Sequence, residues 1–358
     1  MASAAPVPYS PQVEELQEDE AGVVAELNAT FDTILEKTSE DYGHAVRAVH
    51  AKAHGVLGGS FSIEPALPPE LAQGMFASPG THEAIVRIST NPGDILDDAI
   101  ALPRGLALKV LGVAGERLAG AAGESQDFVM VNGPTFMVPT AKKFAGNLKL
   151  LARTTDKAPH AKVALSKVLQ VVNSALGAVG LESSTLGGLG GAPQVHPLGE
   201  TYFSVTPFRY GSYIAKFRLR PLTPALIALT GEKIDTRGRP NAIREEIQSS
   251  MTDIDGQWAF EVQLCRDLEK QPVEDPSVEW KEEEAPFVQV ATLRLPPQDS
   301  WDAARVARVN DETRFSVWTG LAAHQPLGNI NRARKATYQH SADFRATANR
   351  CPIHEPHG

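Results

Sequence analysis

Apolar positions in the first part of the chain recur first at a helical period and then at a strand period. Val24, Leu27, Phe31 and Ile34 are three or four positions apart, which predicts an amphipathic helix from residue 21 to the region of Gly43. Segments 84–90, 105–113 and 127–132 then alternate between apolar and polar residues and are separated by Pro, Gly and Asp. Because no helical pattern separates these strands, we expect an antiparallel sheet or barrel.

The second part of the chain returns to strands after a helical stretch. Helical patterns cover residues 140–153 and 162–179, and LGGLGGAP at 186–193 is expected to be a flexible connection, since no Lys or Thr follows its glycines. Alternating segments at 202–205, 213–219, 258–264 and 287–295 predict further strands, and a last helix is expected at 331–348. The expected fold is therefore α+β, with a helical insert at about residues 140–180.

Composition narrows the function classes. The chain has 358 residues, 42% of them hydrophobic, and a formal net charge of -9, which argues against nucleic acid or an anionic membrane as partner. Two cysteines without CxxC spacing provide neither a disulfide framework nor a zinc ribbon, and we expect a cytoplasmic location. The acidic start is not a signal peptide, and no apolar run reaches the length of about 18 residues that a transmembrane helix needs. We expect a flexible arm at 1–20, one domain at 21–350 and a tail at 351–358.

Four segments in a fixed order carry a family resemblance. His44, His50 and His54 could form a polar surface segment. However, four segments follow one another in the same order as their counterparts in catalases. They are RAVHAK around His50, VRIST at 86–90, PRGLALKV at 103–110 and DFVMVNGPTF at 127–136. The first part of the domain therefore resembles the distal half of a catalase haem pocket.

The resemblance implies a role for each distal residue. His50 would pass a proton between the two oxygens of a peroxide, which a neutral imidazole can do near pH 7. Ser89 would fix the imidazole tautomer and Asn132 would offer its amide to the peroxide. It also implies that Val49 narrows the channel above the iron. Phe136 would contact the cofactor, and Phe144, which could also be an ordinary core aromatic, would stack on the porphyrin.

One position departs from the catalase pattern. Catalases carry two successive Asn in this segment, the first of them catalytic, whereas an ungapped match places Val131 first and Asn132 second. Either the strand shifts by one residue so that Asn132 serves, or the distal amide is absent. A shift of one residue would exchange the two faces of the strand.

A second group of residues lies on the last predicted helix. At about 100° per residue, Tyr338 is about 40° and Arg345 about 20° from Arg334, so the three share one face. They could form an exposed basic face. However, the segment RARKATY, followed by an Arg seven residues after its Tyr, resembles the proximal signature of catalases. This resemblance implies that Tyr338 is the axial ligand of a haem b iron and that Arg334 favours the phenolate form of Tyr338. Arg345, Arg87 and Arg47 would then bind the two propionates, unless some of them form structural ion pairs.

Together these patterns predict a catalase-like antiparallel β-barrel with flanking helices around a buried haem. The resemblance covers residues 43–349 and implies a haem peroxidase with peroxidase or weak catalase activity. The chain is shorter than full-length catalases on both sides, so we expect a wider channel that admits hydrogen peroxide or organic hydroperoxides, and a homo-oligomer is possible. A fatty-acid hydroperoxide isomerase or lyase and a non-catalytic haem-binding protein remain alternatives.

Overall fold

The structure is a computed structural model that describes residues 4–152 and 192–356. Its centre is an eight-stranded antiparallel barrel. The barrel strands are β1 (Ala53–Ile63), β2 (Gly80–Thr90), β3 (Arg104–Val110), β4 (Gln126–Val131), β5 (Tyr202–Phe203), β7 (Tyr213–Pro221), β8 (Gly256–Leu264) and β9 (Phe287–Leu295). Neighbouring strands pair in the order β1-β2-β3-β4-β5-β7-β8-β9, and β9 pairs with β1 to close the ring. A ninth strand, β6 (Phe208–Tyr210), extends β7 as a hairpin.

Side chains fill the interior of the barrel. Alternate residues of each strand point inward, and rings from different strands meet there. Phe260 lies 5.3 Å from Phe61 and 4.7 Å from Phe128, measured between ring centroids, and all three are buried. Because the interior is a packed core, a cofactor can be bound only outside the barrel wall.

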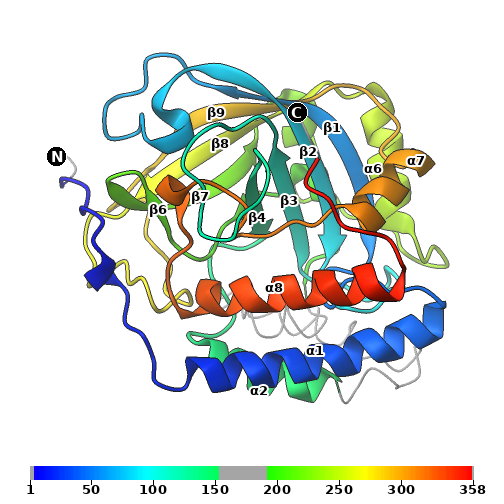
Figure 1. Ribbon diagram of the computed structural model, residues 1–358. Coiled ribbons are helices and arrows are strands. Elements are labelled where there is room, and N and C mark those ends of the chain that lie inside the picture. Colours follow the sequence, from blue (N-terminus) through cyan, green and yellow to red (C-terminus); the bar gives the residue numbers. More distant parts are fainter. Residues whose placement is uncertain (1–3, 153–191, 357–358) are drawn as a thin grey trace, which may run out of the picture.

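Three long helices cover one side of the barrel (Figure 1). These are α1 (Glu20–Tyr42), α2 (Ala141–Ala152) and α8 (Asn329–Ala348), and their apolar faces pack together around Phe31, Leu35 and Leu148. In the figure α8 lies next to the barrel, with α1 and α2 below it. The other helices are α5 (Pro224–Ala228), α6 (Ala242–Asp253) and α7 (Ala303–Ala307), and a π-helical turn, Arg308–Glu312, follows α7.

The structure confirms the predicted α+β class and the barrel with flanking helices. The helix predicted from residue 21 ends at Tyr42, where Gly43 adopts φ 63°, a left-handed conformation that favours glycine. The strands predicted at 105–113 and 127–132 are each displaced by one to three residues at their ends. The helix predicted at 162–179 and most of the connection at 186–193 lie outside the described residues. Strand β1 and helix α6 add to the predicted elements.

The domain boundaries stay predictions, although residues 4–19 have defined contacts. The Val7 amide donates to the Cys265 carbonyl at 2.8 Å, and Arg332 of α8 pairs with Glu14 at 2.6 Å. Among the described residues, no helix has both the length and the apolar character needed to cross a membrane.

Candidate functional site

Two adjoining cavities lie between the barrel wall and the helices. The larger, the main cavity, has a volume of about 560 Å³, and the smaller, the arginine cavity, about 80 Å³. They share six lining residues: Phe31, Val49, His50, Val129, Thr337 and Tyr338. The main cavity lies within the range of about 300–1,000 Å³ that is typical of small-molecule and cofactor sites.

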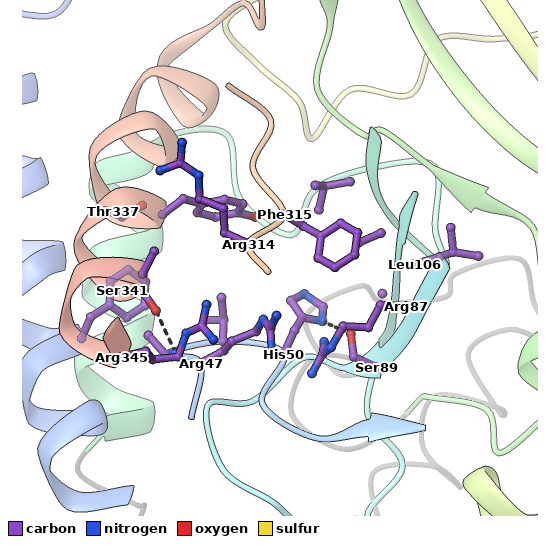
Figure 2. Close-up of a pocket in the computed structure, with 18 of the residues that line it drawn as sticks. Arg47, His50, Arg87, Ser89, Leu106, Arg314, Phe315, Thr337, Ser341 and Arg345 are labelled. Atoms are coloured by element: carbon purple, nitrogen blue, oxygen red, sulfur yellow. Dashed lines mark hydrogen bonds between the residues drawn. The ribbon is translucent and has the colours of Figure 1, made fainter. Parts of the chain in front are cut away.

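His50 enters both cavities from the loop before β1. Its backbone has φ 55°, a left-handed conformation that is uncommon outside glycine, and its amide donates to the Asn91 carbonyl at 2.7 Å. The ring atom Nδ1 lies 3.1 Å from Ser89 Oγ of β2, the pairing that the sequence predicted (Figure 2). This contact fixes the ring orientation and leaves Nε2 as the other polar atom of the ring.

A glycine of β3 makes room for this imidazole. A Cβ atom at Gly105 would lie 2.5 Å from His50 Cε1, closer than real Cβ contacts. The loop that carries His50 also packs closely against Gly93, because a Cβ at Gly93 would lie 2.1 Å from the Ala48 carbonyl oxygen. Sequence reasoning noted Gly105 only as part of a segment and did not identify its role. A glycine within an alternating strand is the available signal.

Burial keeps the His50 imidazole neutral. Desolvation, together with the nearby Arg87, Arg334 and Arg47, lowers the pKa of His50 to about 3. At neutral pH the ring can therefore accept a proton without first losing one.

Tyr338 reaches the two cavities from α8. Its phenolic oxygen accepts hydrogen bonds from Arg334 Nη2 at 2.9 Å and Nε at 3.1 Å. Arg334 is held in turn by Asn331, whose Oδ1 accepts from Nη1 at 3.2 Å and which is itself fully buried. Both hydrogen bonds come from one guanidinium and fix the position of the phenolic oxygen. The structure thus joins Arg334 and Tyr338, as the helical spacing predicted.

Three arginines from different elements gather in the arginine cavity. Arg47 donates to the Asn310 carbonyl at 3.0 Å and to the carbonyls of Val309 and Thr313 at 2.9 Å. Arg87 Nε donates to Asn310 Oδ1 at 3.0 Å, and Arg345 Nη1 donates to the Asn310 carbonyl at 2.6 Å. Figure 2 shows Arg345 on the side of α8, Arg87 on the side of the strands and Arg47 between them. The π-helical turn that carries Asn310 is therefore their common acceptor, which sequence reasoning did not detect.

The positive charge of this group is only partly offset, by Asp311, which acts electrostatically on Arg47 and Arg345 without forming an ion pair with either. Among the described residues none of the three forms an ion pair, and Asp311 pairs with His44 at 2.9 Å. Burial and the neighbouring guanidinium lower the pKa of Arg87 to about 9, and burial lowers that of Arg345 to about 10. The Nε atom of Arg345 is buried without a hydrogen-bond partner. Such a group suits an anionic ligand with carboxylates.

The end of β4 decides which residue faces the main cavity. Strand β4 pairs with β3 in an unbroken register, Met130 and Phe128 point into the barrel core, and Val129 and Val131 line the main cavity. Asn132 also lines it, but its Oδ1 accepts from the Arg104 amide at 2.8 Å and its Nδ2 donates to Glu200 at 2.6 Å. The amide is therefore already paired at both ends, and its catalytic role stays a prediction.

Apolar side chains form the remaining wall of the main cavity. Phe136 and Phe144 lie 5.4 Å apart, measured between ring centroids, and Leu27, Phe31 and Ile330 complete the face from α1 and α8. Val49, next to His50, also lines both cavities. Most of the predicted site residues line the main cavity. The exceptions line only the arginine cavity and are Arg47, Arg87, Ser89 and Arg345. A planar apolar group with an anionic edge fits these surroundings.

Comparisons with known proteins identify the fold. No family model matches the chain, and no curated protein matches it in sequence. A fungal catalase superposes with a TM-score of 0.59 at 16% identity, covering 88% of this chain and 62% of its own. Catalase A from Saccharomyces cerevisiae gives 0.58 at 15% identity, covering 96% and 67%, and a bacterial catalase gives 0.56 at 17%, covering 98% and 66%. The chain spans about two thirds of the length of these catalases, and it has a catalase-like fold.

Proposed function

We propose that the joined cavities bind haem b and that the protein is a haem-dependent, peroxide-consuming oxidoreductase. The carrying observation is that His50 and Tyr338, which are far apart in sequence and belong to a loop and to α8, line the same two cavities. The unpaired arginines beside them supply the charge that two propionates require. A cytoplasmic location and a homo-oligomer remain predictions.

The residues divide the chemistry between two sides of the site. Tyr338 would hold the iron through its phenolic oxygen, which the hydrogen bonds from Arg334 orient, and the haem would supply the redox centre for cleavage of the O–O bond. On the other side, neutral His50 would take the proton from one peroxide oxygen and deliver it to the leaving oxygen. Ser89 would hold the ring in the orientation that this transfer needs.

The distal side differs from a pocket with a free amide. Because Val131 faces the main cavity and the Asn132 amide is paired, we expect no amide to stabilise the departing oxygen. This favours peroxidase activity with slow hydrogen peroxide dismutation.

A visible spectrum of the purified full chain, before and after addition of haem, tests the proposal. We expect a five-coordinate ferric haem with a phenolate ligand, and Tyr338→Phe should shift its bands and weaken haem retention. Tyr9→Phe is the matched control, because Tyr9 also lies beside an arginine, with Arg209 Cζ 4.7 Å from its ring centroid, but lines neither cavity. A wild-type protein that stays colourless with excess haem would contradict the proposal.

The rate of peroxide consumption by His50→Ala tests whether the protein is an enzyme. We expect His50→Ala to lose this activity and the control, His82→Ala, to keep it. Unchanged peroxide consumption in His50→Ala would instead support a haem-binding protein without turnover.

A second candidate is a fatty-acid hydroperoxide isomerase or lyase. The observation that favours it is the apolar wall of Val129, Val131, Phe136 and Phe144, which suits an apolar substrate chain better than hydrogen peroxide. Product analysis with a fatty-acid hydroperoxide, set against oxygen release from hydrogen peroxide, distinguishes the two.

A further inference from the structure

A buried lysine lies beside the main cavity without an anionic partner. Lys216 of β7 is 3% exposed, and its ammonium makes one long hydrogen bond, 3.4 Å, to the Val278 carbonyl. It also lies 4.8 Å from the centroid of the Trp280 ring. An ammonium has three donors, so most of its hydrogen-bonding capacity is unused in the part of the chain that the structure describes.

The two glutamates that line the lysine's cavity are already paired with other cations, and Asp275, which also acts on Lys216, accepts hydrogen bonds from Ser277. Glu279 pairs with Lys281 at 2.9 Å, and Glu282 pairs with Arg218. Lys216 itself forms no ion pair among the described residues. Burying a cation without a partner is costly, so the arrangement suits a ligand that brings its own negative charge.

Lys216 lines a cavity that adjoins the main cavity. Lys216 lines a third cavity of about 80 Å³, the lysine cavity, which shares Pro134, Ser204, Val205 and Glu279 with the main cavity. The strand register explains the connection. Val131 of β4 pairs with Phe203 of β5, and Phe203 pairs with Arg218 of β7. Lys216 is two residues before Arg218 and lies on the same face of β7. Two strand spacings, roughly 10 Å, therefore separate Val131 from the lysine's strand along the outer barrel wall.

We infer that Lys216 binds the carboxylate of a long-chain monocarboxylate whose apolar chain lies along the end of the main cavity that Pro134 and Val205 line, next to the lysine cavity, so that the rest of the main cavity is left to the haem. The main cavity supplies the apolar wall, and the lysine cavity supplies one buried cation at its far end. That the reacting group of this ligand is a hydroperoxide facing His50 rests on the proposed function. The carboxylate contact with Lys216 does not.

The charge state of the lysine makes the contact sensitive to pH. Burial lowers the pKa of Lys216 to about 7, against the opposing influence of Glu279, Asp275 and Cys265. Burial also raises the pKa of Cys265 to about 11, so this thiol stays neutral below pH 9. As pH rises from 6 to 9 the lysine loses its proton while a bound carboxylate stays ionised, so the affinity for a carboxylate should fall.

Calorimetric titration of the full chain, purified with haem, tests the inference with decanoate and 1-decanol. We expect decanoate to bind more tightly than decanol at pH 6, and Lys216→Met to weaken decanoate by about tenfold or more while leaving decanol unchanged. Lys270→Met is the control, because Lys270 is an exposed lysine paired with Glu284.

The pH series keeps the inference testable if Lys216→Met does not fold. Wild-type affinity for decanoate should fall between pH 6 and 9, and that for decanol should not. Equal binding of the two probes at all pH values, or equal loss in both lysine variants, would overturn the inference. A protein that stays colourless with excess haem but still binds decanoate through Lys216 would contradict the proposed function and retain this inference.

Discussion

The barrel interior and the region between the barrel wall and α8 are built from different kinds of side chain. The barrel interior is closed by packed aromatic rings such as Phe61, Phe128 and Phe260. The region between the barrel wall and α8, by contrast, contains His50 and five arginines, of which only Arg314 forms an ion pair among the described residues, together with open volume. Packed apolar side chains stabilise a fold, whereas buried cations without carboxylates oppose folding. The difference indicates that the interior supports the fold and that the outer region is reserved for a ligand.

The largest expected effect comes from damaging the barrel interior. Phe260→Ala removes a fully buried ring that contacts Phe61, Phe76, Phe128 and Phe217, so we expect the free energy of unfolding to fall by about 3–5 kcal/mol. Denaturant unfolding of the haem-free protein measures it. If Phe260→Ala lowers the free energy of unfolding no more than a substitution at an exposed residue such as Ile227→Ala, the barrel interior does not stabilise the fold in the way proposed.

A smaller effect, on rate and not on stability, is expected at Gly105. The Cβ of Gly105→Ala would meet the His50 ring, so the imidazole must move from the position that Ser89 fixes. A displacement of about 1 Å can cost about 10²-fold in rate, and we expect a loss of this order in peroxide consumption. Gly58→Ala, where no atom lies within 4 Å of the added Cβ, is the control. Full activity in Gly105→Ala would show that the His50 position is not critical.

Removing one arginine should have opposite effects on the free and the loaded protein. Arg345→Leu deletes a buried cation whose Nε has no partner, so the haem-free protein should unfold at the same denaturant concentration or at a higher one. Its affinity for haem should fall about tenfold, the loss typical of one charge-assisted contact. The exposed Arg237→Leu should change neither measurement. Destabilisation of the haem-free protein by Arg345→Leu would mean that this arginine is structural.

The smallest effect is expected from pH. Because the pKa of His50 is lowered to about 3, the ring gains a proton only as pH falls toward that value. His50 should therefore cause no inflection in the peroxide rate between pH 5 and 8, measured at constant ionic strength. A wild-type inflection near pH 6.5 that disappears in His50→Gln would place the ring in a far more solvated site than the structure shows.

Much of the fold and half of the site were accessible from local patterns. The two-residue period marked seven of the barrel strands, and the helical period placed Arg334 beside Tyr338, now measured at 2.9 Å. Helix α6 was not predicted, although its buried Ile243, Ile247 and Met251 recur every four residues, the spacing of an amphipathic helix.

The sequence by itself determined which residue types occur on each face of each element, because alternation and helical spacing depend on near neighbours. Only the tertiary structure decided that Val131 faces the main cavity, since this depends on the register of β4 against β3. It also decided that Asn310 collects three arginines and that Gly105 makes room for His50. These contacts join residues far apart in the chain, so they follow from how elements pack and not from the period of any one segment.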